Sequence, residues 1–295
     1  MEFIVHDTLT AMAGLLAQPL DRRPGALREM LEPMRPAIPM PGDLIDMHHG
    51  GGGFRVDAED PRYLPAVQRM IDADVLGQVR RELTRASEAL SGAKQQDSLR
   101  VMFVLGNPDS EHLMKVGGGY YGMGTSPGWL YVLAWPSDEV IGRIAHCAVH
   151  EFHHNVRYTN VEWNPATWSV GEHVVSEGLA EAFVRELSGP EAMGPWSSMV
   201  TGEALEEAHR LIMDAFGLVG MQHTSAYVLG DTAMRNFGQE PRGIPDMAGY
   251  GVGLRLVDRV LAATGLSVEE ATLLPAAELM RRADEARQGE TWPGA

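Results

Sequence analysis

The segment His150-Glu151-Phe152-His153-His154 holds the residue types that bind a zinc ion and use it for hydrolysis. It lies in a stretch, about 139–158, whose apolar positions recur at helical spacing. Residues four apart lie on one face of a helix, so His150 and His154 can occupy two corners of a zinc tetrahedron. Glu151 then lies beside the open corner, where it can act on a bound water.

A catalytic zinc site needs a third protein ligand, and a second helical stretch offers two carboxylates. Glu177 and Glu181 lie four residues apart between Val174 and Phe183. We expect Glu177 to bind the metal and Glu181 to accept the free N–H of a ligating histidine, which fixes that ring's tautomer. Gly178 would allow another backbone to approach closely. The alternative for the two glutamates is a solvated acidic stripe.

Three further residues are candidates for supporting roles. Tyr250 and His223 follow the expected ligands, where a zinc peptidase typically places the group that stabilises an oxyanion. Tyr250 is favoured because its two glycine neighbours would leave its hydroxyl accessible, and the alternative is a packed aromatic ring. His146 lies one turn before His150 and could hydrogen-bond a ligand, although a core histidine bonded to a carbonyl is the simpler interpretation.

A second pair of histidines, His48 and His49, precedes four consecutive glycines. Two interpretations are open for this segment. The histidines could form a second metal site, or the glycine loop could reach over a cleft.

The elements that must position these residues follow from the apolar pattern. Short apolar runs predict strands at 99–105 and 129–135, and the second could be an edge strand that pairs with an extended peptide. Residues 1–95 should form a mainly helical region, and 96–160 should contain the strands and the metal-binding helix. Residues 161–295 should form a helical lobe that carries the third ligand.

Composition excludes several classes of partner and metal site. The formal net charge is −16, from 40 acidic and 24 basic residues, which argues against nucleic acid and anionic membranes. Cys147 is the sole cysteine, so any metal must be held by His, Asp or Glu. No apolar run approaches the roughly 18 to 20 residues of a membrane span, and acidic residues near Met1 are unlike a secretory signal. We therefore expect a cytoplasmic protein.

Three segments, taken together, resemble a known protein family. They are His-Glu-Phe-His-His-Asn-Val-Arg-Tyr at 150–158, Ser-Glu-Gly-Leu-Ala-Glu at 176–181, and Ile-Pro-Asp-Met-Ala-Gly-Tyr-Gly-Val-Gly-Leu-Arg-Leu-Val at 244–257. They are similar to the predicted zinc-dependent proteases of the DUF2268, or YjaZ-like, family, over about residues 98 to 285. The resemblance implies a gluzincin-like site with His150, His154 and Glu177 as zinc ligands and Glu151 as general base.

The sequence therefore predicts an α+β, zincin-like fold, with a small mixed sheet beside the metal-binding helix and a mainly helical C-terminal lobe. The expected function is a zinc-dependent metallopeptidase in which Glu151 activates a zinc-bound water and the substrate is a peptide or protein. Two alternatives stay open: a small-molecule amidase, and a zinc-bearing regulatory or binding protein without turnover. Glu151 favours an enzyme, because a protein that only binds would not need a base.

Overall fold

A computed structural model describes residues 1–38, 42–236 and 238–290, with side chains described up to residue 286. The protein is a mixed α+β chain, mostly helical, with one four-stranded mixed sheet. Its chain divides into two compact units, residues 1–88 with 96–155 and residues 89–95 with 156–295.

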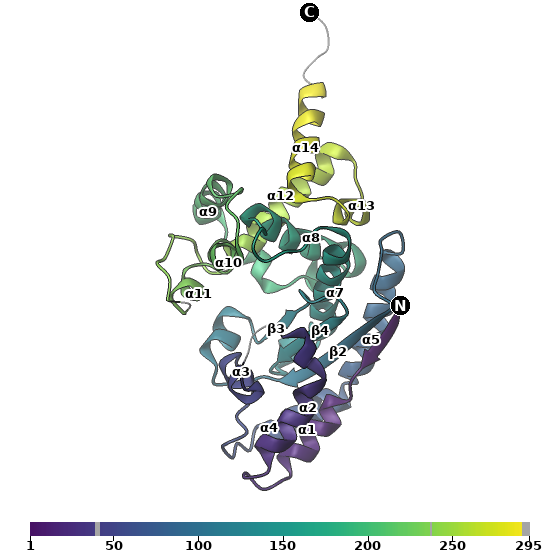
Figure 1. The fold of residues 1–295 in the computed structure, drawn as a ribbon, viewed down its shortest axis with the longest axis vertical. Coiled ribbons are helices and arrows are strands. Elements are labelled where there is room, and N and C mark those ends of the chain that lie inside the picture. Colours follow the sequence, from purple (N-terminus) through teal and green to yellow (C-terminus); the bar gives the residue numbers. More distant parts are fainter. Residues whose placement is uncertain (39–41, 237, 291–295) are drawn as a thin grey trace, which may run out of the picture. The chain divides into compact units, whose positions relative to one another are not determined.

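The first unit contains the sheet, in the order β1-β2-β4-β3 (Figure 1). The pairs β1–β2 and β2–β4 are parallel, and β3 runs antiparallel to β4. The strands are β1 (Glu2–Val5), β2 (Ser98–Leu105), β3 (Tyr120–Met123) and β4 (Trp129–Ala134). The two predicted strands are confirmed as β2 and β4, but the expectation that the second is an edge strand is wrong. It lies between β2 and β3, and β3 forms that edge of the sheet.

The helices of the first unit up to residue 89 expose polar residues on one side and bury apolar residues on the other. Asp7 caps α1 by accepting a hydrogen bond from the Thr10 amide, and the apolar side chains of α1 are buried: Leu9, Met12, Leu15 and Leu16. Helices α1 and α4 pack against each other and against β2. The helices are α1 (Thr8–Leu16), α2 (Arg23–Leu31), α3 (Leu44–Gly50), α4 (Tyr63–Asp72), α5 (Val75–Ala89), α6 (Asp138–Ile141) and α7 (Ile144–Asn160), with a 3₁₀ helix at Glu32–Ala37 and a short π-helix at His112–Val116. The end of α7, from Val156, belongs to the second unit.

The helix α7 covers one face of the sheet. The Phe152 ring of α7 contacts the Phe3 ring of β1, with centroids 6.1 Å apart. At the other end of the sheet, β3 approaches α7 so closely that a side chain at Gly122 would overlap Glu151. Phe3 and Gly122 thus place α7 across the sheet from β1 to β3.

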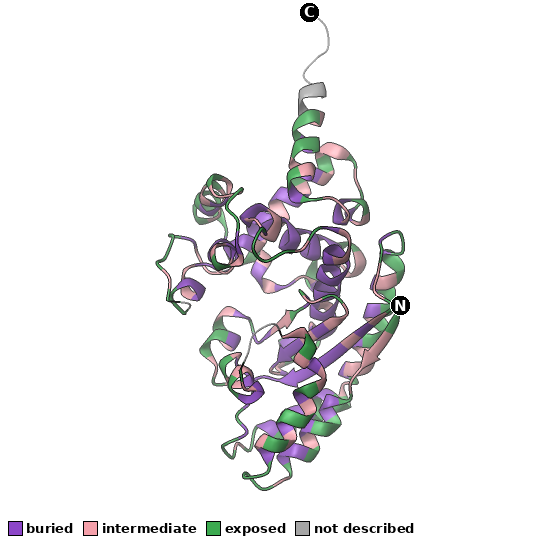
Figure 2. Cartoon of the chain, viewed as in Figure 1, coloured by how far each residue is buried: buried purple, intermediate pink, exposed green. Residues whose placement is uncertain are grey.

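The second unit is helical, and its core surrounds α8 and α12. Figure 2 shows buried residues along most of α8, whereas α9 is largely exposed. Its helices are α8 (Val170–Ser188), α9 (Gly202–Asp214), α10 (Met221–Leu229), α11 (Asp231–Asn236), α12 (Ala248–Thr264), α13 (Val268–Thr272) and α14 (Ala276–Glu290), with 3₁₀ turns at Pro190–Ala192 and Pro195–Ser198. No helix in the described part of the chain combines the length and apolar character that a membrane span needs.

Candidate metal centre

The helix α7 buries three polar side chains of the predicted motif. His150 is 2% exposed, Glu151 6% and His154 3%. Their neighbours on the helix are also buried, as its apolar composition requires: Ile144, Ala148, Val149, Phe152 and Val156. Burying imidazole and carboxylate groups costs free energy unless partners satisfy them, so this stretch of α7 calls for a chemical reason.

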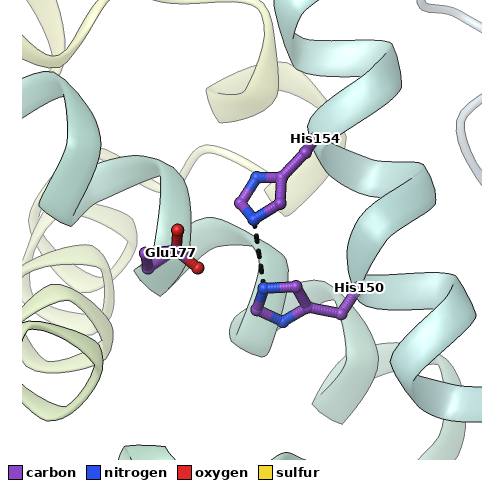
Figure 3. Close-up of side chains that lie close together, drawn as sticks. All are labelled: His150, His154 and Glu177. Atoms are coloured by element: carbon purple, nitrogen blue, oxygen red, sulfur yellow. Dashed lines mark hydrogen bonds between the residues drawn. The ribbon is translucent and has the colours of Figure 1, made fainter. Parts of the chain in front are cut away.

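The two histidines point their rings toward each other, as Figure 3 shows. The Nε2 atoms of His150 and His154 lie 3.1 Å apart. Two nitrogens bound at the usual zinc distance and at a tetrahedral angle would be about 3.3 Å apart. The pair is therefore already spaced to share one tetrahedral ion.

Glu177 of α8 completes the group. His150, His154 and Glu177 each offer one ligand atom, and these atoms all lie within 4.8 Å of one another. The carboxylate of Glu177 faces the two imidazoles in Figure 3, and Glu177 is 6% exposed. Two imidazole nitrogens and one carboxylate oxygen form a donor set that suits zinc. The structure thus brings together the three residues that the sequence predicted as ligands.

Glu151 is held against the edge strand β3. A Cβ atom added at Gly122 would lie 2.3 Å from Cγ and 2.7 Å from Oε1 of Glu151. A Cβ at Gly124 would lie 2.1 Å from the Glu151 carbonyl oxygen. A Cβ at Gly122 would therefore displace the Glu151 side chain, and a Cβ at Gly124 would meet the backbone of α7. The carboxylate of Glu151 is therefore placed at the sheet edge by two residues without side chains.

Asn155, one turn after Glu151, fixes the loop between β3 and β4. Its amide nitrogen donates to the carbonyl oxygens of Gly124, at 2.7 Å, and Trp129, at 2.8 Å. Its amide oxygen accepts from the Gly128 amide at 2.6 Å. The side chain is almost fully buried, so these three bonds join the metal-binding helix to the hairpin without competition from water. Sequence reasoning did not single out Asn155.

A backbone contact between two helices supports Glu177. A Cβ at Gly178 would lie 2.2 Å from the carbonyl of Gly253 on α12, and a Cβ at Gly253 would lie 2.1 Å from the Val174 carbonyl oxygen. The predicted close approach at Gly178 is confirmed, and its partner is a glycine of the third quoted segment. The helices α8 and α12 therefore meet with their main chains in contact beside Glu177.

A buried arginine holds the neighbour of Glu177. Arg157 is fully buried, and its Nε donates to the Ser176 hydroxyl at 2.9 Å. The same guanidinium pairs with the Glu172 carboxylate and donates to the carbonyls of Thr272 and Leu274, both at 3.0 Å. All of these residues belong to the second unit. Several partners share the buried charge, as a stable buried ion pair requires.

The remaining candidates lie on α7, on α8 or on helices that pack against α8. Glu181 is buried and accepts a hydrogen bond from the Gly194 amide at 2.9 Å. Tyr250 lies in the first turn of α12, half-buried, with its ring 5.4 Å from the Trp196 ring. His223 lies in the first turn of α10, and α10 and α12 both pack against α8. His146 is half-buried on α7. The roles assigned to these residues from the sequence stay predictions.

His48, the first histidine of the pair before the glycines, has a structural explanation. His48 is 5% exposed, its Nε2 lies 2.8 Å from the Phe54 carbonyl oxygen, and its ring fills the space beside Gly53. Burial lowers the pKa of His48 to about 4. Among the residues that the structure describes, the group of His150, His154 and Glu177 is the one cluster able to hold a metal. A second metal site at His48 gains no support.

Fold and site together define a mixed α+β protein with a buried His-His-Glu group and an adjacent glutamate. The chain belongs to the DUF2268 family, described as "Predicted Zn-dependent protease", whose model matches residues 79–281. It is 36% identical over 172 residues to a Bacillus subtilis (strain 168) protein named "Uncharacterized protein YjfC". That match covers 58% of this chain and 56% of the relative. No solved structure matches the chain significantly.

Proposed function

We propose that this protein is a zinc-dependent metallopeptidase with a zincin-like, gluzincin-type site. The observation that carries the proposal is the buried group of His150, His154 and Glu177, with ligand atoms within 4.8 Å of one another. Glu151 follows the first of these ligands on the same helix and is also buried. A site built only to hold a metal would not need this fourth group, which favours an enzyme over a zinc-bearing regulatory protein.

Each residue has a distinct task in the proposed reaction. His150, His154 and Glu177 would hold the ion. When bound, zinc lowers the pKa of a coordinated water and polarises the carbonyl of the scissile bond. Glu151 would act as the general base, taking a proton from the attacking water and passing it to the leaving nitrogen. Burial keeps bulk water away from the carboxylate, which strengthens its hydrogen bonds to the reacting groups.

A peptide substrate fits the sheet edge next to Glu151. The strand β3 forms one edge of the sheet, and its Gly122 lies against the Glu151 carboxylate. An extended peptide can add to a free strand edge through main-chain hydrogen bonds. Such pairing would bring a backbone amide to the base, and it needs several consecutive peptide groups. This geometry supports a peptidase over an amidase for small molecules.

The oxyanion would be stabilised by Tyr250 or His223. Both lie in first turns of helices that pack against α8, which carries Glu177. Tyr250→Phe removes one hydroxyl and keeps the ring against Trp196. If Tyr250 is the donor, kcat should fall by roughly 10²-fold or more while KM barely changes. If His223→Ala alone produces that loss, the role belongs to His223.

Metal analysis combined with hydrolysis of a diverse peptide library tests the proposal. Wild-type protein should hold about one zinc per chain, and Glu177→Ala should lose most of it. Glu151→Gln should keep the zinc and lose hydrolysis by at least roughly 10²-fold. Near-normal turnover by Glu151→Gln would refute the mechanism. Wild-type protein that holds zinc but cleaves only small amides would point to the amidase, and no turnover at all would point to the regulatory protein.

A further inference from the structure

His173, one turn before Glu177 on α8, has no task in the proposed reaction, yet it contacts the candidate ligand. Its Nε2 lies 3.5 Å from Oε1 of Glu177. Its Nδ1 lies 3.1 Å from the hydroxyl oxygen of Thr224 on α10. Thr224 is fully buried, and the His173 side chain is 15% exposed. The three residues form a chain from α10 to the carboxylate.

The chemistry of the three groups fixes the direction of these contacts. An ionised carboxylate only accepts hydrogen bonds, so a favourable contact with Glu177 requires a hydrogen on Nε2 of His173. In a neutral imidazole the other nitrogen, Nδ1, is then an acceptor, and Thr224 donates to it. The Met221 carbonyl, at 3.4 Å, is a more distant acceptor for the same hydroxyl. In this arrangement Thr224 donates to Nδ1 and supports the tautomer of His173 that can donate to Glu177.

The start of α10 is fixed to the start of α8 by main-chain hydrogen bonds. The segment 216–220 pairs with 168–171 through three of them, each 2.8 or 2.9 Å long. These are Val170 N–H to Leu218 O, Gly171 N–H to Phe216 O, and Gly220 N–H to Trp168 O. Gly171 leaves room for the Phe216 ring, which a Cβ would overlap at 2.3 Å. Thr224 therefore follows a segment that main-chain hydrogen bonds join to the start of the helix that carries His173.

We propose that His173 and Thr224 are positioning residues that hold the Glu177 carboxylate in the orientation needed to bind the metal. This inference rests on the proposed function, because it takes Glu177 as a ligand. An unsupported glutamate has several rotamers, and fixing one of them before binding removes that entropy loss from the binding step. The 3.5 Å contact is at the outer limit of a hydrogen bond, and such contacts tighten when a site is loaded.

The alternative role for His173 is that of a ligand. In the described residues, the group whose ligand atoms lie mutually within 4.8 Å contains His150, His154 and Glu177 and does not include His173. The Nε2 of His173 faces a Glu177 oxygen from the same helix, four residues away. A residue in that position acts on the metal through the carboxylate, as the partners of ligating side chains do in other metal sites.

The zinc dissociation constant, measured by competition with a fluorescent chelator, tests the proposal without use of peptidase activity. His173→Phe keeps a ring and removes both nitrogens, so zinc should bind about 10- to 100-fold more weakly. Thr224→Val should weaken binding several-fold, and Thr224→Ser, which keeps the hydroxyl, should restore it. Ser225→Ala is the matched control on the same turn, because its hydroxyl bonds the Met221 carbonyl of its own helix. Circular dichroism confirms that each variant is folded.

A second measurement separates positioning from a general effect on the fold. In a Glu177→Ala background, His173→Phe should cause no further loss of zinc affinity, since the carboxylate it holds is gone. An equal loss in both backgrounds, or wild-type affinity in His173→Phe, would overturn the inference while the proposed function stands. A loss as large as that of His150→Ala would make His173 a ligand instead. Wild-type protein that fails to bind zinc would overturn both proposals.

Discussion

The helices α7 and α8 carry the candidate ligands, and they are held in place by different kinds of contact. The histidine helix α7 is joined to the β3–β4 hairpin by the side chain of Asn155, through three hydrogen bonds. The glutamate helix α8 meets α12 main chain to main chain, at Gly178 and Gly253. The contact of α7 depends on the polar atoms of the Asn155 side chain, whereas the contact of α8 depends on the lack of a side chain at Gly178 and Gly253.

This difference decides which substitutions each region tolerates. A side-chain clamp fails when its polar atoms are deleted, because buried main-chain groups then lose their partners. A glycine contact fails when a single carbon is added, because neither backbone can move aside without shifting a helix. Deletions should therefore damage the Asn155 clamp on α7, and additions the contact of Gly178 and Gly253 between α8 and α12.

The largest effect on stability is expected from Gly253→Ala. The new Cβ would lie 2.1 Å from the Val174 carbonyl oxygen, so α8 and α12 must separate. Alanine favours a helix by about 1 kcal/mol over glycine, but overpacking against backbone should exceed that gain and leave a net loss of about 3 kcal/mol. Denaturant unfolding measures the loss. Gly217→Ala, where a Cβ meets nothing within 4 Å, is the control. Equal stability of the two variants would contradict the glycine contact.

The second-largest loss of stability is expected from Asn155→Ala. It leaves the Gly124 and Trp129 carbonyls and the Gly128 amide without their side-chain partner, and should destabilise the protein by about 2 kcal/mol. Asn155→Asp keeps the acceptor for Gly128 but loses both donors, so it should be no more stable than the alanine variant. Thermal unfolding compares the two. An aspartate variant as stable as wild type would show that the donor bonds contribute nothing.

The sequence predicted those parts of the fold that have long apolar patterns. Strands β2 and β4 and helices α7 and α8 were found because six or more residues carry a clear signal of burial. The strands β1 and β3 were missed, since each has four residues. The sequence Tyr-Tyr-Gly-Met of β3 lacks alternation and contains a glycine, which is typical of a loop. Only pairing with β4 makes it a strand.

The candidate site was predictable where ligands follow local helical spacing. His150 and His154 are four residues apart on one helix, and Glu177 lies in its own helical pattern. His173 has the same four-residue relation to Glu177 as Glu181 has, on the N-terminal side, so that signal was present but was not used. The hydrogen bonds of Asn155 to the hairpin and of Thr224 to His173 join residues distant in sequence, and only the fold brings them together.

A third prediction concerns pH and the first unit. The pKa of His48 is lowered from 6.5 to about 4 by burial, so the unfolded chain binds a proton at pH values where the folded chain does not. The contribution of neutral His48 to the free energy of unfolding is therefore fully present at pH values above 6.5 and is lost as the pH falls toward 4. Linkage gives a loss of about 1.4 kcal/mol between pH 7.5 and pH 5.5.

His48→Gln tests this pH dependence, because the glutamine amide can still donate to the Phe54 carbonyl but does not titrate. The difference in unfolding free energy between wild type and variant should shrink or reverse by about 1.4 kcal/mol from pH 7.5 to pH 5.5. Parallel pH profiles for the two proteins would mean that the pKa of His48 is the same in the folded and the unfolded state, which would contradict the prediction.

The smallest effect on stability, and the most informative for function, is expected from Gly122→Ala. Its Cβ would meet the side chain of Glu151, with Cγ at 2.3 Å and Oε1 at 2.7 Å, and a side chain can rotate away where a backbone cannot. We expect less than about 1 kcal/mol of destabilisation and unchanged zinc content, because the ligands are not touched. Hydrolysis should nevertheless fall about tenfold or more, since the base is displaced from the water that it must deprotonate.

Gly124→Ala, directly after the end of β3, is the matched variant for Gly122→Ala. Its Cβ would meet the Glu151 carbonyl oxygen at 2.1 Å, a backbone atom of α7, so it should behave like Gly253→Ala and lose stability. The two neighbouring glycines should therefore separate catalysis from folding: kcat falls at 122 and the unfolding free energy falls at 124. If Gly122→Ala retains full kcat with full zinc, the Glu151 carboxylate does not act from the position against β3, and the placement of the base at the sheet edge is wrong.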